Sequence, residues 1–290
     1  MTVVVSSLSS LTRLVLGRNN FRGSIPASFG NLSALSVLSS VFNKLSGSIP
    51  YELGRLYKLR VLVLSYNNLT ARNPLETKSG NELSNIMNTL SNCSNLRTLG
   101  LGENNFSGLL PNSIANFSKV LSQFCLSEND ISGCIPVGIG NLLNLQIVSV
   151  FGNMLSGSIP ESIEERIPDS LGNCKRLQSL HLGSNKLTGM IPGPIFELSS
   201  LSIGLFLSDN QLTGPIPTQI GNLRNLGQLD LSENKLSGGI PATLSSLQVL
   251  EVLSLAGNHF EGPIPASLNQ LKGIRILDLS HNILSGQIPC

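Results

Sequence analysis

The most regular feature of the chain is an alternation of leucines and polar residues that recurs along nearly its whole length. In residues 226–241, Leu229 and Leu231 alternate with polar residues, and this period of two predicts a short strand with one buried face and one solvent-exposed face. Asn234 follows where the chain leaves the strand, and its amide offers both a donor and an acceptor to backbone groups in a buried turn. Pro241 has no backbone N–H, so we expect strand pairing to weaken there.

This unit recurs with an asparagine at the same place in every copy, and we call these residues the ladder asparagines. They are Asn19, Asn43, Asn67, Asn104, Asn129, Asn153, Asn185, Asn210, Asn234, Asn258 and Asn282. Successive spacings are 24 or 25 residues, except for 37 before Asn104 and 32 before Asn185. Leucines at strand spacing with a fixed period in the twenties are the signature of a leucine-rich-repeat solenoid. We therefore predict an α/β fold, a right-handed horseshoe with a parallel concave β-sheet and repeats of about 24 residues.

Many repeats close on the motif G-x-I-P, which resembles the plant-specific subtype of the leucine-rich repeat. Copies of this close run from Gly23 to Pro26, Gly47 to Pro50, Gly189 to Pro192 and Gly286 to Pro289. The resemblance implies that these residues contribute a second small sheet beside the concave one. We expect one elongated domain over residues 1–290, with eleven repeats and without end caps, so the chain reads as an excerpt from a longer one.

The two long spacings predict different irregularities. The first holds an insert over about residues 75–92, in which Leu83, Ile86, Met87 and Leu90 recur at helical spacing. We predict an α-helix over residues 80–91 whose apolar stripe packs on the convex side, in preference to forming a groove for a partner. The second spacing contains two Ile-Pro closes, which predicts an irregular junction at residues 161–168.

Composition and charge narrow the function only slightly. The chain has 41% hydrophobic and 12% charged residues, no Trp and a net charge of +2. Residues 1–75 contain eight Lys or Arg and one acidic residue, whereas residues 76–290 contain eleven and sixteen. This asymmetry suits an oriented polar ligand, although drift among solvated surfaces explains it more simply. Few aromatic residues accompany the basic part, so we expect no nucleic-acid partner.

No group of residues predicts catalysis or metal binding. His181, His259 and His281 belong to different repeats, without Cys or carboxylates at ligand spacing. The glycines are explained by the repeat and form no phosphate loop or nucleophile elbow. Five cysteines leave at least one unpaired, and we expect no disulfide. We therefore expect no enzyme, no metal and no cofactor.

The insert that ends Leu90-Ser91-Asn92-Cys93-Ser94-Asn95-Leu96 and the stretch from Leu198 to Ser202 are similar to ectodomains of plant receptor kinases of the Xa21-like, bacterial-pattern-sensing group. The resemblance implies a peptide or protein ligand, a co-receptor kinase, a place on the extracellular side of the plasma membrane, and a role in immune or developmental perception. We expect this chain to contain no signal peptide, membrane helix or kinase domain. The alternatives are a secreted protein resembling polygalacturonase inhibitors and a fragment of a receptor Ser/Thr kinase.

Recognition should depend on the variable strand positions, which precede each ladder asparagine by seven, six, four, two and one residues. In the second and third repeats these positions hold an apolar cluster of Val37, Val41, Phe42, Val61, Val63 and Tyr66 with Arg60, beside Arg13 and Arg18. Farther on they hold Phe151, His181, Phe206, Asp230, Glu233 and Asp278. We predict a ligand-binding concave face that includes Phe42, Arg60, Val63, Tyr66, Phe151, His181, Phe206 and Asp230. The alternative is repeat decay, because Ser40 replaces a core leucine nearby.

Five N-glycosylation sequons all precede the midpoint of the chain. They begin at Asn31, Asn68, Asn92, Asn105 and Asn116, and none falls on the predicted concave strand positions. Short sequons arise by chance in Asn- and Ser-rich repeats, but used sequons imply secretion of the parent protein.

Overall fold

The computed structural model describes residues 7–71, 82–157 and 169–289. The chain forms two compact units, residues 1–145 (unit 1) and 146–290 (unit 2). In each unit, a typical repeat contributes a strand to a first sheet, a turn around the ladder asparagine, a strand to a second sheet, and a short 3-10 helix that leads to the next repeat. This is the leucine-rich-repeat solenoid predicted from the periodicity.

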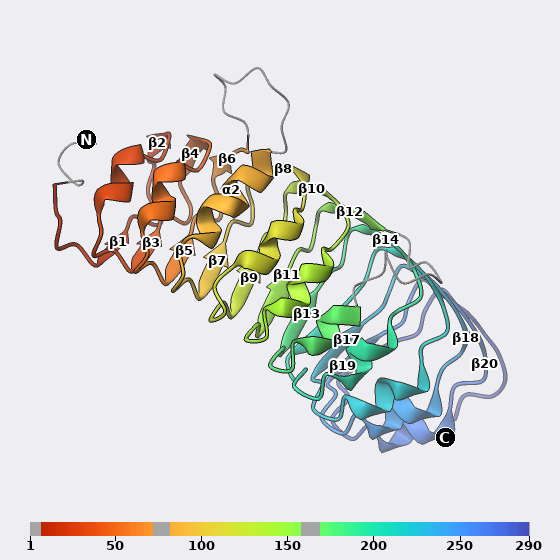
Figure 1. Ribbon diagram of the computed structural model, residues 1–290. Helices are drawn as coiled ribbons and strands as arrows, with labels where there is room; N and C mark the ends of the chain where they lie inside the picture. The colour runs from red at the N-terminus through yellow and green to blue at the C-terminus, as the bar shows by residue number, and fades with distance from the viewer. Residues whose placement is uncertain (1–6, 72–81, 158–168, 290) are drawn as a thin grey trace. The chain divides into compact units, whose positions relative to one another are not determined.

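The first sheet of unit 1 is parallel, and its strands follow one another in chain order (Figure 1). Its strands are β1 (Arg13–Val15), β3 (Val37–Ser39), β5 (Val61–Val63), β7 (Thr98–Gly100) and β9 (Gln123–Cys125). The central residue of each strand pairs with the central residue of the next, and all of these central residues are buried. The leucine column therefore forms one wall of the core.

The rest of unit 1 consists of short strands and 3-10 helices. The strands are β2 (Arg22–Gly23), β4 (Lys44–Gly47) and β6 (Asn68–Leu69), which pair in that order, and β8 (Ser107–Leu109) with β10 (Asp130–Gly133). The helices are η1 (Ala27–Asn31), η2 (Tyr51–Arg55), η3 (Asn112–Asn116) and η4 (Val137–Asn141). Each of these helices follows directly on the proline that ends an x-x-x-P close, and the proline itself is extended.

The predicted α-helix is confirmed over the part of it that the structure describes. Helix α2 (Glu82–Ser91) packs against η2 and η3, and it lies in the same layer as these helices in Figure 1. The apolar stripe Leu83, Ile86, Met87 and Leu90 is buried, so this face serves packing and offers no groove. The remainder of the predicted insert and helix, at residues 75–81, and the predicted junction at residues 161–168 lie outside the described residues.

Unit 2 repeats the same plan. Its first sheet runs β11 (Ile147–Ser149), β13 (Ser179–His181), β15 (Gly204–Phe206), β17 (Gln228–Asp230), β19 (Val252–Ser254) and β21 (Ile276–Asp278). Its second sheet runs β12 (Met154–Gly157), β14 (Lys186–Gly189), β16 (Gln211–Gly214), β18 (Lys235–Gly239), β20 (His259–Gly262) and β22 (Ile283–Leu284). Its 3-10 helices are η5 (Asp169–Asn173), η6 (Gly193–Glu197), η7 (Thr218–Asn222), η8 (Ala242–Ser246) and η9 (Ala266–Gln270).

The strands of the second sheets begin one residue after the ladder asparagine or close to it, and many end at the glycine of the G-x-I-P close. In β14, Gly189 is the last strand residue and has a φ of 78°. A left-handed residue turns the chain, and the following Pro192 has no N–H to donate. The resemblance placed the whole G-x-I-P motif in this sheet, and the structure refines that expectation: the motif ends the strand.

The ladder asparagines satisfy the turns as predicted. The Asn234 amide donates to the carbonyls of Leu231 and Leu207, at 3.2 and 3.0 Å, and accepts from the Leu212 N–H at 3.0 Å. Asn234 thus bonds its own repeat to the preceding one, and the same pattern recurs at Asn67 and Asn258. Because these amides are buried, the pattern fixes the spacing of the repeats.

Candidate functional site

The exposed side of the first sheet is the surface on which residue identity varies most from repeat to repeat. We call it the open face, and define it by the positions six, four, two and one residues before each ladder asparagine. The position immediately before the asparagine has an unusual backbone: it is left-handed in all eleven repeats, with φ between 49° and 65°. Two of these residues are Gly152 and Gly257, and the other nine have side chains in a conformation that favours glycine.

In unit 1, two of these left-handed residues are aromatic and stack on each other. The rings of Phe42 and Tyr66 have centroids 4.1 Å apart and planes 22° apart. The guanidinium of Arg18, the left-handed residue of the first repeat, lies 5.6 Å from the Phe42 ring centre. Phe42 and Tyr66 are each 44% exposed. Three successive repeats therefore present a continuous stack of planar groups to solvent.

Aliphatic side chains extend this stack across the strands of unit 1. Val37 pairs with Val61 in the sheet, and Val63 pairs with Ser39. All three valines are partly exposed, whereas the strand centres between them are buried. Arg60 precedes β5 and is exposed. The structure thus brings Phe42, Val63, Tyr66 and the neighbouring valines together as the predicted apolar cluster.

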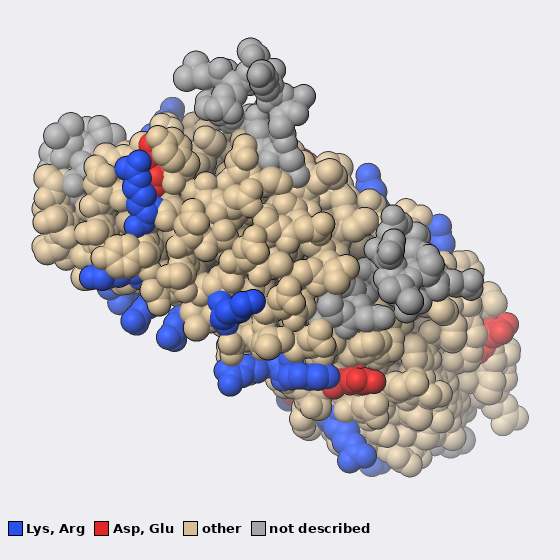
Figure 2. Space-filling model, in the orientation of Figure 1, with Lys and Arg blue, Asp and Glu red and all other residues tan. Residues whose placement is uncertain are grey.

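Basic side chains lie along one side of this cluster. Figure 2 shows Lys and Arg side chains gathered near β1, β3 and β5 in unit 1. The left-handed positions of the next two repeats hold Glu103 and Glu128, and both are exposed. The open face of unit 1 therefore changes from basic to acidic along its strand order.

Unit 2 has a second aromatic stack, made by His181 and Phe206 at paired positions of β13 and β15. Their ring centres are 4.3 Å apart and their planes 19° apart. The Phe206 ring lies over Gly204: a Cβ added there would be 2.3 Å from the ring, so the absent side chain makes room for it. The His181 Nε2 is 2.7 Å from the hydroxyl of the buried Ser179, and burial lowers the pKa of His181. The contact with Ser179 orients the imidazole, and the lowered pKa favours its uncharged form.

Carboxylates follow the aromatic stack in unit 2. Asp230 pairs with Phe206 across β15 and β17, and its Oδ1 accepts from the N–H and hydroxyl of Ser232 at 3.1 and 2.6 Å. Asp278 makes the same pair of bonds to Ser280. These bonds, with the nearby His281, hold the pKa of the Asp278 carboxyl below its usual value.

Phe151 is 36% exposed and belongs to the same open face. Its ring leans toward Gly183 of the next repeat, where an added Cβ would lie 3.3 Å from the ring. The predicted residues of unit 2 thus lie on one surface, and His181, Phe206 and Asp230 are direct neighbours within it. Whether these residues bind a ligand stays a prediction.

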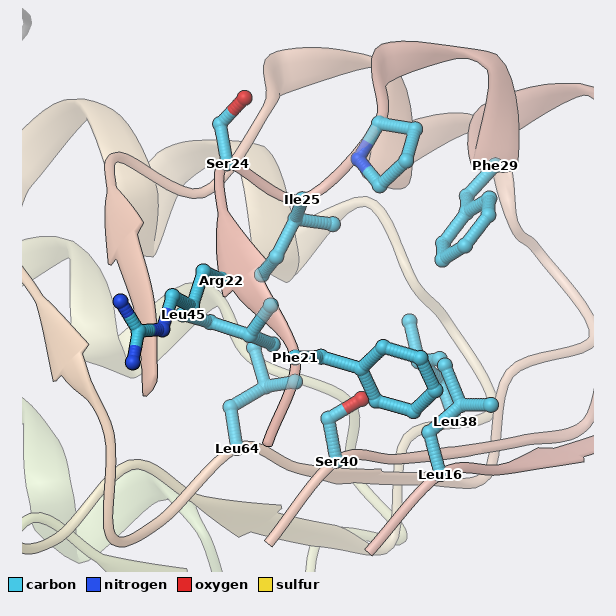
Figure 3. A pocket seen from close by; sticks show the side chains of 11 residues that line it. Leu16, Phe21, Arg22, Ser24, Ile25, Phe29, Leu38, Ser40, Leu45 and Leu64 are labelled. Atoms are coloured by element: carbon cyan, nitrogen blue, oxygen red, sulfur yellow. The ribbon is translucent and has the colours of Figure 1, made fainter. Parts of the chain in front are cut away.

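A cavity of about 260 Å³, partly open to solvent, lies in the first three repeats of unit 1, behind the open face. Its lining is almost entirely apolar, and Phe21, Phe29, Leu38 and Ser40 are among the residues that line it (Figure 3). Ser40 occupies the position three residues before a ladder asparagine, where the neighbouring repeats have Leu16 and Leu64. The shorter side chain of Ser40 therefore contributes to the cavity. The polar residues of the lining are Arg22, Ser24 and Ser40, and the other lining residues are apolar.

Among the described residues, the cysteines and acidic residues do not form a second site. Burial raises the pKa of the Cys93 and Cys174 thiols to about 11, and the Cys93 Sγ lies 3.4 Å from the Leu53 carbonyl. Within residues 7–71, 82–157 and 169–289, no three His, Cys, Asp or Glu side chains are arranged to hold a metal ion. Nor does any helix in these ranges have the length and hydrophobicity needed to cross a membrane.

Sequence reasoning missed two features of this face. It placed Phe42 and Tyr66 on the surface but gave no sign that their backbones are left-handed, although glycine at the matching positions Gly152 and Gly257 was a signal. It placed His181 and Phe206 at equivalent strand positions but did not predict that their rings stack, although Gly204 in the same strand indicated room for a large neighbour.

Comparison with protein-family models finds leucine-rich repeats along the chain. One leucine-rich-repeat model matches residues 175–236 and 203–260. A second matches residues 10–32, 95–117 and 273–290.

Curated relatives include plant receptor kinases. The chain is 58% identical over 57 residues to the receptor kinase-like protein Xa21 of Oryza sativa subsp. japonica, covering 20% of this chain and 6% of that protein. It is 48% identical over 61 residues to the LRR receptor-like serine/threonine-protein kinase EFR of Arabidopsis thaliana, covering 21% and 6%. The matched segments thus span a small part of the length of these relatives.

A solved structure matches nearly the whole chain. The Arabidopsis receptor kinase HAESA, in complex with the peptide hormone IDA and the co-receptor SERK1, superposes with a TM-score of 0.73 at 37% identity. The match covers 99% of this chain and 48% of the chain in that structure.

Proposed function

Because this chain is a leucine-rich-repeat protein homologous to plant receptor kinase ectodomains, we propose that it recognises a peptide or protein ligand on its open face. The Phe42–Tyr66 stack is the observation that carries the proposal. The repeat turn gives this position a left-handed backbone in every repeat, and in two adjacent repeats the residue there is an aromatic one whose ring remains 44% exposed. Core packing alone would not favour exposed aromatic groups in this conformation.

The surroundings of the stack indicate the kind of ligand. Valines beside the rings provide apolar contact, and arginines and glutamates lie at opposite ends of the unit 1 face. Exposed aromatic residues within a polar surround are typical anchors in protein interfaces. An extended peptide with an apolar side chain and charges of both signs suits this surface better than a small metabolite.

The wider biological role is proposed from the relatives. The chain would belong to the extracellular side of a plasma-membrane receptor and would take part in immune or developmental signal perception with a co-receptor kinase. The named complex of HAESA with a peptide hormone and SERK1 supports a peptide ligand and such a co-receptor. The chain itself would act by binding and not by catalysis.

Glycosylation fits the same proposal. Asn31, Asn68, Asn92, Asn105 and Asn116 are all exposed, and none of them lies at an open-face position. Glycans at these sites would cover the helices and second sheets of unit 1 and leave its open face accessible. Secretion from plant cells followed by glycopeptide mapping would show whether the five sites are used.

The test begins with a random linear-peptide library selected against the 290-residue chain. For the peptides retained, Tyr66→Ala and Phe42→Ala should each weaken binding by about 1–3 kcal/mol. The matched control is Tyr51→Ala, because Tyr51 is 69% exposed but belongs to η2 on the helical side. Unchanged affinity of both open-face variants, or an equal loss with Tyr51→Ala, would refute recognition at this surface.

A further inference from the structure

The two aromatic stacks of the open face differ in whether a cationic side chain of the protein lies against them. In unit 1, the chain supplies its own cation, because the Arg18 guanidinium lies against the outer end of the Phe42–Tyr66 stack. In unit 2, no described Lys or Arg lies over the His181–Phe206 stack in this way. None of the unit 2 residues six, four, two or one places before a ladder asparagine is Lys or Arg.

The position of Phe206 within its row shows where a cation would fit. Register places His181 on one side of Phe206 and Asp230 on the other, each one strand away. Since His181 stacks on Phe206 with nearly parallel rings, one ring face is covered and the opposite face is turned toward the row of Asp230. Adjacent strands are about 4.8 Å apart, so this ring face and the carboxylate can contact the same planar group.

The Asp230 carboxylate is suited to complete such a contact. Its Oδ1 is occupied by the N–H and hydroxyl of Ser232, which fixes the group and leaves Oδ2 as an acceptor. Asp230 forms no ion pair with any residue in the described part of the chain. Glu233, the next carboxylate, lies over Gly257 in the following repeat and is therefore directed away from Phe206.

We propose that unit 2 contains a subsite for an arginine side chain of the ligand, in which the guanidinium stacks on Phe206 and donates a hydrogen bond to Oδ2 of Asp230. A guanidinium is planar, carries several N–H donors and stacks on aromatic rings, whereas an ammonium is a compact and strongly hydrated charge. The subsite should therefore prefer arginine to lysine. This inference rests on the proposed function, and it specifies a side chain that the ligand would carry.

The experiment titrates the 290-residue chain with N-acetyl-arginine amide and follows ring signals of labelled phenylalanine by NMR. N-acetyl-citrulline amide has nearly the same shape without the charge, and N-acetyl-lysine amide has the charge without the plane. We expect one phenylalanine signal to shift in a saturable way with the arginine probe, and this signal to be missing in Phe206→Leu. Both other probes should bind at least about fivefold more weakly.

The matched control uses the second Asp–Ser pair. Asp230→Asn should weaken the arginine probe about tenfold. Asp278→Asn alters the same hydrogen-bonded arrangement in β21, where the paired residue on the preceding strand is Ser254 in place of a phenylalanine, and it should leave binding of the arginine probe unchanged. Melting curves check that the variants are folded. The asparagine variant keeps the ring intact, so a folding defect in Phe206→Leu would not remove the test.

Three results would overturn the subsite: no saturable shift, equal binding of the citrulline probe, or equal losses in the two asparagine variants. Its failure is distinguishable from failure of the proposed function. Library peptides that lose affinity with Tyr66→Ala but bind equally to wild type and Asp230→Asn would retain open-face recognition and remove only the arginine subsite.

Discussion

Phe42 and Tyr66 stack with their ring centres 4.1 Å apart while both backbones are left-handed, with φ of 57° and 59°. The two rings come from adjacent repeats and are held in line by the same turn. A repeat can therefore present a large side chain to solvent without disturbing the leucines beneath it. This separation between surface and core leads to the first prediction.

Phe42→Gly should change the free energy of unfolding by no more than about 1 kcal/mol. Glycine relieves the left-handed strain of roughly 1 kcal/mol, which offsets the lost ring stacking of about 0.5–1.5 kcal/mol. Leu64→Ala should instead cost about 2–5 kcal/mol, because Leu64 is 1% exposed and its truncation leaves a cavity. Denaturant unfolding of the two variants measures the contrast. A loss at Phe42→Gly as large as that at Leu64→Ala would mean that the ring is part of the core.

Ser40→Leu should stabilise the chain by about 1–3 kcal/mol, because the added carbons fill part of the apolar cavity. The two asparagine hydrogen bonds to residue 40 use its backbone carbonyl and would persist. Thermal melting measures the gain. A lower melting temperature would show that the larger side chain does not fit and that Ser40 is required at this place.

Asn234→Ala should destabilise the chain by about 2–4 kcal/mol. The change leaves the Leu212 N–H and the carbonyls of Leu207 and Leu231 without their side-chain partner in a buried turn. Asn225→Ala is the control, since the Asn225 amide is exposed and makes a single 3.4 Å bond to the Ser199 carbonyl. Similar unfolding midpoints for the two variants would contradict the structural role of the ladder.

Acid should weaken folding partly through His181. Burial lowers the pKa of His181 in the folded chain, so the unfolded chain binds more protons between that lowered pKa and about 6.5. The contribution is fully present above about pH 6.5 and is lost as the pH falls through the folded-state pKa. The melting temperature of wild type should therefore drop more between pH 8 and pH 5 than that of His181→Gln. Parallel pH profiles for the two proteins would exclude this contribution.

The periodic sequence predicted most of the fold because the residues that form the core of a repeat can be recognised within that repeat. The parallel sheet predicted from the leucine spacing is confirmed, and its strands are centred at leucines that include Leu14, Leu62, Leu99, Leu180, Leu229, Leu253 and Leu277. Leucines at strand spacing determine which residues are buried, and the asparagine amide determines where the chain turns. Both features depend on residues close together in the sequence, so both could be predicted. The helix at 82–91 could be predicted for the same reason.

The arrangement of the candidate site could be predicted only in part. Column positions placed Phe42, Tyr66, His181 and Phe206 on one face, but stacking depends on rotamers and on neighbours in the next repeat. The Phe206 ring can lie over Gly204 because glycine has no side chain. A pattern of apolar and polar residues does not predict this placement of the ring. Local periodicity thus predicts which residues reach the surface, whereas their mutual contacts require coordinates.

The direct pairing of β5 with β7 has a consequence for how such a chain can evolve. Val61 pairs with Thr98, and Val63 with Gly100, although the ladder asparagines of these repeats lie 37 residues apart. The additional residues leave the pairing of β5 with β7 on the open face unchanged. Insertions on the helical side of a repeat can therefore alter chain length and glycan placement while the open face keeps its strand spacing.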